Sequence, residues 1–174
     1  VLTPGTQVRF LGNYHFYVNG HLEAVSTESD PITFTSLPGD QIKFSGQWHG
    51  IDFNDSSNDS SVIRHAVIEY AVDGIYWNEA NARLEDVVVR YNSDMGLQIN
   101  GNNSGPVITN VEAHHNGNDG IYTYDGQPVF TNVNSHHNSR YGIYYNYSAH
   151  GKATGCQFND NDSHGIRLYN SCSP

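Results

Sequence analysis

The sequence has few basic residues, few cysteines and no long apolar run. Eight lysines and arginines stand against 18 aspartates and glutamates, which gives the 174-residue chain a formal charge of −10. This charge would repel a phosphate backbone, so we expect no nucleic-acid partner. Without an apolar stretch of about 18 residues, we also expect no membrane insertion. Neutral glycans or proteins fit the charge better than a polyuronate chain, which would need a bridging divalent cation.

Leucine is also scarce, whereas Asn, Gly and Tyr are abundant. This composition disfavours amphipathic helices and favours turn-rich β structure. The composition does not change along the chain, so residues 1–174 are expected to form a single domain. The chain begins at Val1 without a signal peptide, which indicates a processed form or a segment of a longer protein.

The cysteines and the glycosylation sequons give information on the cellular location of the protein. Cys156 and Cys172 permit one disulfide bridge, but two cysteines alone do not identify the redox environment. Asn-x-Ser sequons mark glycosylation acceptors on secreted proteins and favour an extracellular or cell-surface location. The expected glycosylation sites are Asn54, Asn58, Asn102 and Asn146.

A glycine followed by an aliphatic residue recurs along the chain. The intervals between these glycines are 24, 22, 24, 22 and 23 residues, and periods in this range are typical of solenoids. Leucine-rich repeats share the period but need a leucine framework that this chain lacks. The repeat therefore predicts an all-β parallel β-helix of about seven rungs. The glycines are Gly50, Gly74, Gly96, Gly120, Gly142 and Gly165.

Within each unit, apolar residues alternate with polar ones, as strands with one inward face require. Stacked rungs would bury these residues as continuous columns. One column is formed by the aliphatic residues after each glycine. The others are Ile63, Leu84, Ile108, Phe130 and Ala153; Ala66, Val87, Val111, Val133 and Cys156; and Phe53, Trp77, Ile99, Thr123, Tyr145 and Leu168.

An asparagine stands four residues before the glycine in four consecutive units, at Asn92, Asn116, Asn138 and Asn161. A stacked Asn can pass side-chain amide hydrogen bonds to the next rung while its backbone takes a tight bend. We expect an inward-pointing asparagine ladder, which argues against a glycan on Asn161.

Strand-like stretches at 4–10, 17–25 and 31–34 predict the first rungs. With these, the chain resembles the right-handed parallel β-helix proteins of the pectin-lyase-like superfamily over nearly its whole length. The resemblance implies a right-handed solenoid with rungs of 22 to 24 residues. The superfamily includes pectate lyases, polygalacturonases, alginate epimerases, phage tailspikes and surface proteins without known activity, so the fold alone does not assign a function.

No catalytic motif of the superfamily is complete in this chain. The segment 163–168, Ser-His-Gly-Ile-Arg-Leu, is similar to a polygalacturonase motif, but it lacks the leading Gly, the Lys and the paired Asp. Outward acids on adjacent rungs, namely Asp52, Asp73, Asp119 and Asp125, could reach the separation that glycoside hydrolysis needs. Solvated turn residues explain the same pattern. Asp119 is the weak catalytic candidate among them.

Two adjacent histidine columns stand out. His114 and His136 share one column, His115 and His137 the next, and Asp160 continues the second. Four imidazoles on two rungs could hold a transition metal, form a pH-sensitive patch or, at His114 and His136, act in catalysis. Because the repeat itself generates this spacing, a stacked surface ladder is the favoured interpretation, and no cofactor is expected beyond an optional divalent cation.

An outward column on the Gly-Ile strand contains Tyr76, Tyr122 and Tyr144. Exposed tyrosines can stack against sugar rings or dock a protein, although cross-strand stabilisation also accounts for them.

The sequence as a whole favours an extracellular structural or adhesive protein. The repeat starts within the first residues and runs almost to Pro174, so the ends of the solenoid carry no evident cap. Copies of the chain could then join head to tail into a filament, or the chain could bind cell-surface proteins or glycans. The alternative function is a polysaccharide-active enzyme, of lyase or glycoside hydrolase type, or a glycan-binding module.

Overall fold

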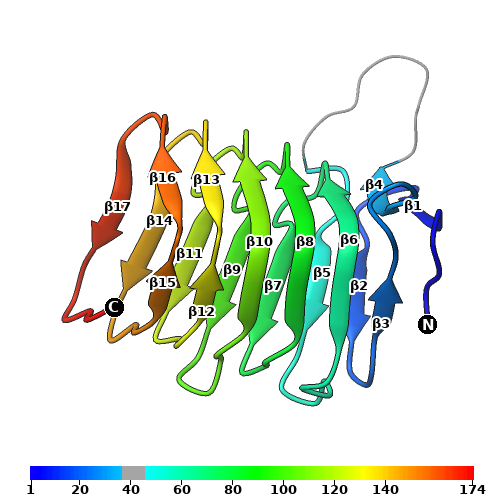
Figure 1. Cartoon of the computed structure of the whole chain (residues 1–174), viewed down its shortest axis with the longest axis horizontal. Coiled ribbons are helices and arrows are strands. Elements are labelled where there is room, and N and C mark those ends of the chain that lie inside the picture. The colour runs from blue at the N-terminus through cyan, green and yellow to red at the C-terminus, as the bar shows by residue number, and fades with distance from the viewer. Residues whose placement is uncertain (37–45) are drawn as a thin grey trace.

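The computed structural model describes residues 1–36 and 46–174 and shows a solenoid of parallel strands. Successive turns of the chain stack along one axis, and the two termini lie at opposite ends (Figure 1). Two sheets run along this axis and enclose the core between them. This arrangement confirms the predicted parallel β-helix.

The first sheet, called sheet A, has ten strands. Its central strands are eight residues long. On each of the rungs towards the C-terminus, two short strands take the place of one long strand. In spatial order the main path is β1 (Gln7–Phe10), β4 (Ile32–Ser36), β6 (Val62–Glu69), β8 (Arg83–Arg90), β10 (Val107–His114), β12 (Val129–Thr131) and β15 (Lys152–Thr154). Beside it lie β3 (Glu23–Val25), β13 (Asn134–His136) and β16 (Gln157–Asn159).

The second sheet, called sheet B, has seven strands and contains the Gly-Ile repeat. Every neighbouring pair is parallel, and the edge strands are β2 and β17. The strands are β2 (His15–Val18), β5 (Gly50–Phe53), β7 (Ile75–Asn78), β9 (Leu97–Asn100), β11 (Ile121–Tyr124), β14 (Tyr141–Asn146) and β17 (His164–Leu168).

The register of both sheets agrees with the predicted columns. In sheet A, Leu84 pairs with Ile108, which pairs with Phe130. In sheet B, Leu97 pairs with Ile121, which pairs with Ile143. The register therefore places the apolar columns inside the solenoid, where their members are buried except on the last rung. There Ala153, Ile166 and Leu168 are exposed and Cys156 is half-buried. The strands near the N-terminus, β1 to β4, also confirm the first rungs.

The asparagine ladder is present as predicted. Each Nδ2 donates to the Oδ1 of the next asparagine at 2.9 Å, from Asn92 through Asn116 and Asn138 to Asn161. The first three are at most 1% exposed, so these bonds compensate for the loss of water around the amides. The ladder holds the bend between sheet A and sheet B in the same place on each rung.

Other bends use residues in the left-handed region of backbone space. At one bend of sheet A, Asp86, Asn110 and Asn132 all have φ between 53° and 54°. Their side chains are joined along the solenoid axis, because Asn132 Nδ2 donates to Asn110 Oδ1 at 3.2 Å and Asn110 Nδ2 donates to Asp86 Oδ1 at 2.9 Å. Asn and Asp tolerate this conformation better than most residues, which explains their abundance at these positions.

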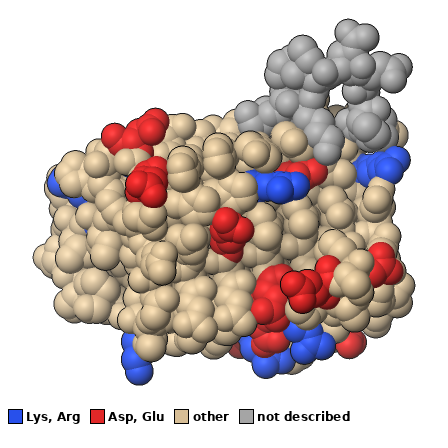
Figure 2. Space-filling model, turned by 45° about the horizontal axis from the view of Figure 1, so that its top comes forward, with Lys and Arg blue, Asp and Glu red and all other residues tan. Residues whose placement is uncertain are grey.

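Charged groups are sparse on the surface. On the face seen in Figure 2, acidic and basic side chains form a few small groups between wide uncharged areas. Arg90 and Glu69 form an ion pair at 3.0 Å, and because Glu69 is 4% exposed, this pair is partly buried. No helix within residues 1–36 and 46–174 has the length and apolarity to span a bilayer.

Candidate functional site

The outward face of sheet B carries a continuous column of polar and aromatic side chains. Strand pairing aligns them from the N-terminal to the C-terminal rung as Tyr17, Asp52, Tyr76, Gln98, Tyr122, Tyr144 and Arg167. The three tyrosines predicted to bind a ligand, Tyr76, Tyr122 and Tyr144, therefore lie on one face, with Gln98 between the first two. A linear surface of this kind matches the shape of an extended chain better than that of a small compact ligand.

Neighbouring asparagines hold two of these tyrosines in place. Asn100 Nδ2 donates to the Tyr76 hydroxyl at 3.2 Å, and Asn146 Nδ2 donates to the Tyr122 hydroxyl at 3.1 Å. Each amide comes from the following rung of the solenoid. Because the phenol oxygen accepts these bonds, its own proton stays available to donate to a ligand.

A group of titratable residues lies at the N-terminal end of the same face. We call His15, His49, Asp52 and Asp73 the acid–histidine cluster. The His15 Nδ1 atom lies 2.5 Å from Asp52 Oδ2, and the rings of His15 and His49 stack with centroids 4.0 Å apart. Tyr17 stacks on the other side of this group, 4.7 Å from the His15 ring. Strand pairing of β2 with β5 brings His15 and Tyr17 beside Asp52, and His49 directly precedes β5. Asp73 lies one rung further on, before β7, where its backbone N–H donates to the His49 carbonyl at 3.1 Å.

Both aspartates of the cluster hold protons more tightly than exposed carboxyls do. Burial raises the pKa of Asp52, although the hydrogen bond from His15 and the nearby His49 oppose the rise. Burial raises the pKa of Asp73 to about 6, and its neighbours Asp94 and Asp52 add to that rise. The backbone N–H of Met95 donates to Asp73 Oδ1 at 3.0 Å and opposes it. Perturbed carboxyls beside histidines are typical of acid–base sites.

Asp119, the weak catalytic candidate, is held in an ion pair. It is 0% exposed, and its oxygens accept from Arg140 Nε at 2.8 Å and from a second guanidinium nitrogen at 2.5 Å. The backbone N–H of Tyr141 also donates to it, at 3.2 Å. These contacts raise the pKa of Arg140 and favour a structural role for Asp119 at the turn before β11.

The four histidines of the two predicted columns lie on a different sheet. His114 and His136 end β10 and β13 of sheet A, and His115 and His137 follow them directly, so the structure does not bring His114 and His136 together with Asp119 in one site. Their rings stack as predicted: His114 lies 5.3 Å from His136, and His115 lies 5.3 Å from His137. Within residues 1–36 and 46–174, no three or more His, Cys, Asp or Glu side chains are arranged to hold a metal ion together.

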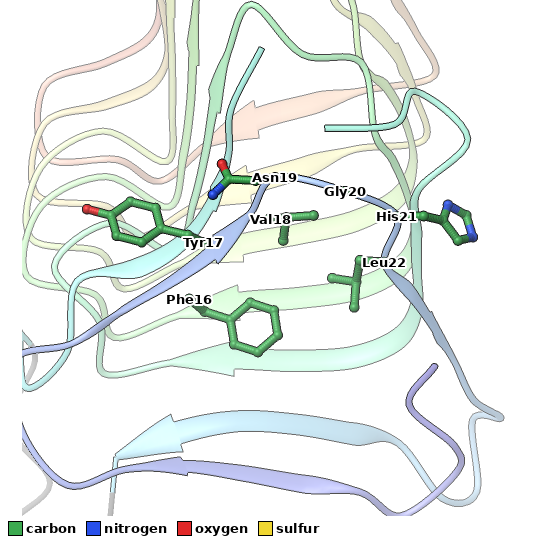
Figure 3. A pocket seen from close by; sticks show the side chains of 7 residues that line it. All are labelled: Phe16, Tyr17, Val18, Asn19, Gly20, His21 and Leu22. Carbon is green, nitrogen blue, oxygen red and sulfur yellow. The ribbon is translucent and has the colours of Figure 1, made fainter. Parts of the chain in front are cut away.

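Two of the hollows in the described surface have volumes near 200 Å³. One, of about 200 Å³, lies at the N-terminal rung and is lined by residues 16–22. In Figure 3, Phe16, Val18 and Leu22 point into the solenoid there, while Tyr17 and His21 point away from it. The other, of about 210 Å³, lies on sheet A. Its lining residues are Glu28, Pro31, His65, Ala66, Val67, Asp86 and Val88.

The predicted glycosylation sites differ in their surroundings. Asn58 and Asn102 are exposed, whereas Asn54 donates to Asn19 Oδ1 at 2.8 Å and Asn146 donates to the Tyr122 hydroxyl. A glycan on either of the latter two would compete with these bonds. Asn58 and Asn102 are therefore the more accessible acceptors, and glycosylation at all four stays a prediction.

The two cysteines are separate thiols in the structure. Cys172 Sγ donates to the Tyr147 carbonyl at 2.7 Å, and Cys156 Sγ donates to the Thr154 carbonyl at 3.5 Å. Both thiols pack against the core at the C-terminal end. The disulfide between them stays a prediction.

Sequence reasoning missed the histidines of the acid–histidine cluster. His15 pairs with Gly50, so it occupies the position of the repeat glycine on the first rung. Because the Gly-Ile pattern is absent from residues 15–18, the repeat could not be used to align this strand with the later rungs. The one available signal was the alternation of residues 15–18, which places His15 and Tyr17 on the same outward face as Asp52.

The family of the chain is decided by its sequence. The model of the right-handed β-helix region matches residues 39–174, which is most of the chain. The chain belongs to the right-handed β-helix family. This assignment agrees with the all-β solenoid and with the suspected superfamily. A search of curated proteins found none whose sequence matches that of this chain.

Among solved structures, the fold is similar to that of an alginate lyase from Paenibacillus sp. str. FPU-7. The match covers 95% of this chain and 69% of the lyase, with 18% sequence identity and a TM-score of 0.44. The likeness concerns the course of the backbone in a right-handed β-helix and does not extend to the reaction.

Proposed function

We propose that sheet B of this β-helix binds a polysaccharide along its outward tyrosine column and that the acid–histidine cluster performs acid–base chemistry on it. The observation that carries this proposal is the cluster itself. It combines a 2.5 Å His–Asp hydrogen bond with a carboxyl of raised pKa on the next rung, at one end of a linear aromatic face.

The chemistry follows from the protonation of each group. Because the pKa of Asp73 is raised to about 6, a substantial fraction of the molecules carries a protonated Asp73 carboxyl in mildly acidic solution. This carboxyl can protonate a leaving oxygen. Asp52 orients the His15 ring through Nδ1, which directs the other nitrogen of the ring away from the carboxylate as a base for water. One proton donor and one base are the requirements for hydrolysis of a glycosidic bond.

The charge of the chain selects the substrate class. The described basic residues next to the tyrosine column are Arg140 and Arg167, and Arg140 is neutralised by Asp119. With a net charge of −10 and acids in the cluster, the face would repel a polyuronate. A neutral glycan avoids this repulsion and can stack its apolar ring faces on Tyr17 and Tyr76.

The proposal predicts the effect of two substitutions on turnover. With Asp73→Asn or His15→Gln, hydrolysis of a neutral polysaccharide is expected to fall by about 100-fold or more, while binding of the glycan stays within about threefold. Asn at position 73 can still accept from the Met95 N–H, so the turn is preserved. Reducing-sugar release over a panel of neutral and uronic polysaccharides measures turnover, and affinity electrophoresis measures binding.

Exposed residues of the same types provide matched controls. Asp55→Asn and His21→Gln alter exposed side chains outside the cluster and should leave turnover unchanged. Because Asp73 must be protonated to act, the rate should decline as the pH rises through about 6. If no polysaccharide is bound or cleaved, or if the controls lose as much activity as the cluster variants, the proposal is wrong.

A second proposal, head-to-tail association, rests on the C-terminal rung. Ile166 and Leu168 are 53% and 49% exposed, whereas Ile143 and Tyr145, at the same column positions one rung earlier, are 0% and 3% exposed. Within residues 1–36 and 46–174, strand β17 is an edge strand of sheet B. A second copy of the chain, adding its edge strand β2, would bury these apolar side chains and pair this edge.

This second proposal predicts concentration-dependent assembly. Light scattering after size-exclusion chromatography should show elongated multimers that dissociate when Ile166 and Leu168 are both changed to Asp. Val107→Asp, on the middle of sheet A and 40% exposed, should leave them intact. A protein that stays monomeric at all concentrations would contradict the structural or adhesive role and leave the glycan proposal unaffected.

A further inference from the structure

The histidine pairs at the C-terminal ends of β10 and β13 in sheet A have an unusual local geometry. In the His114–His115 pair and in the His136–His137 pair, the two Nδ1 atoms face each other at 2.6 Å. The rings of each pair are nearly perpendicular, at 81° and 83°. Two rungs therefore repeat one arrangement, in which two imidazole nitrogens converge on the same point.

Backbone conformation produces this convergence. His115 and His137 have φ of 54° and 52°, in the left-handed region, directly after the ends of β10 and β13. In a regular strand, consecutive side chains point to opposite faces. The left-handed residue breaks that alternation, so two neighbouring histidines turn towards each other. Both sit just before the asparagine ladder, whose hydrogen bonds fix the bend.

The hydrogen bonds assign the protons of the second pair. His136 Nε2 lies 2.8 Å from Glu112 Oε1, and a carboxylate can only accept, so Nε2 carries a proton. In a neutral His136 ring, Nδ1 then has a free lone pair. The 2.6 Å contact requires one proton between the two Nδ1 atoms, so it is on His137.

A metal ion can take the place of that shared proton. Imidazole nitrogens suit late first-row transition metals, and copper(II) forms the most stable complexes in the divalent series. A metal-binding histidine commonly donates its other ring N–H to a carboxylate, which fixes its tautomer. Glu112 already makes this contact with His136. We propose that the Nδ1 atoms of His136 and His137 chelate a divalent late transition metal, with water in the remaining positions.

Binding changes the tautomer of one ring only. His136 keeps its Nε2 proton on Glu112, whereas His137 moves its proton from Nδ1 to Nε2 through solvent. Both rings stay neutral, so no net proton is released when the pair is neutral beforehand. Each Nδ1 lone pair then forms one bond to the metal, and small ring rotations open the 2.6 Å separation.

The two pairs are not equivalent as sites. Arg90 occupies the rung next to His114 in the same column, and its positive charge opposes a cation there. The other pair has Glu112 beside it and Asp160 on the following rung. We therefore expect the tighter site at His136 and His137.

Titration of the whole chain with Cu²⁺ against a competing chelator tests the assignment. His137→Asn keeps a residue that tolerates positive φ and should weaken the tight site by about 100-fold, and Glu112→Ala should weaken it by about 10-fold. His115→Asn makes the same change on the preceding rung, where φ differs by 2°, and should leave the tight site intact.

Spectroscopy separates this chelate from nonspecific binding. Electron paramagnetic resonance of the Cu²⁺ form should show coupling to two imidazole nitrogens. Long-range ¹H–¹⁵N spectra should show His137 protonated at Nδ1 without metal and at Nε2 with Zn²⁺. Equal losses in His115→Asn and His137→Asn, or tight binding that survives in His137→Asn, would overturn the proposal. Neither result would bear on the glycan face of sheet B.

Discussion

Replacing Asn116 by Ala is expected to lower the free energy of unfolding by about 3 kcal/mol. The side chain is 1% exposed and stands in the middle of the ladder. Its Nδ2 donates to Asn138 Oδ1 at 2.9 Å, and its Oδ1 accepts from Asn92 Nδ2 at 2.9 Å. Alanine would leave polar groups on both neighbouring rungs without partners and without water. Chemical denaturation followed by fluorescence measures the loss, because Trp48 and Trp77 are both fully buried.

A nearby asparagine provides the comparison. Asn118 lies two residues further on and makes one side-chain bond, from Nδ2 to Asp94 Oδ1 at 2.8 Å, in a half-buried position. Asn118→Ala should cost about 1 kcal/mol or less, because water can replace the lost amide. If both variants lose the same stability, the buried ladder is not what holds the rungs together.

Gly96→Ala is the second large effect, with an expected loss of about 2–4 kcal/mol. A Cβ at this position would lie 2.6 Å from the Gly120 carbonyl oxygen and 2.8 Å from Asn116 Nδ2. Neither atom can move freely, since one belongs to the backbone of the next rung and the other to the asparagine ladder. The repeat glycine is therefore required by the close approach of successive rungs.

Gly20→Ala serves as the matched control for this substitution. A Cβ there would meet no atom within 4 Å, and its φ lies outside the left-handed region. Alanine should be neutral or stabilise by up to about 1 kcal/mol, because it restricts the unfolded chain. Thermal unfolding of the two variants in parallel decides the point: similar melting temperatures would contradict the close-approach explanation.

Much of the fold could be predicted because each rung repeats the last. Once Gly96 and Gly120 were aligned, the recurrence of apolar residues at matching positions placed Ile108 and Val111 inside and Tyr122 outside, and the structure confirms all three. The stacking of His114 on His136 followed from the same register. A solenoid makes such inference reliable because neighbours in space are one period apart in sequence.

The candidate site was less accessible to this reasoning. His15 replaces the repeat glycine, and its contact with Asp52 joins residues 37 positions apart. The raised pKa of Asp73 comes from burial and from Asp94 and Asp52, none of which a local pattern reveals. Conversely, Asp119 matched the same outward pattern but is neutralised by Arg140.

By itself, the sequence determined the solenoid, its period, the inward columns and the asparagine ladder, because these depend on a spacing that recurs at every rung. Only the tertiary structure decided which polar residues act together. The His15–Asp52 contact depends on a local departure from the repeat, whereas the burial of Asp73 and the facing Nδ1 atoms of His136 and His137 depend on side-chain positions that the repeat spacing does not determine. These positions set distances of a few ångströms between side chains, and those distances govern hydrogen bonding, proton affinity and metal binding.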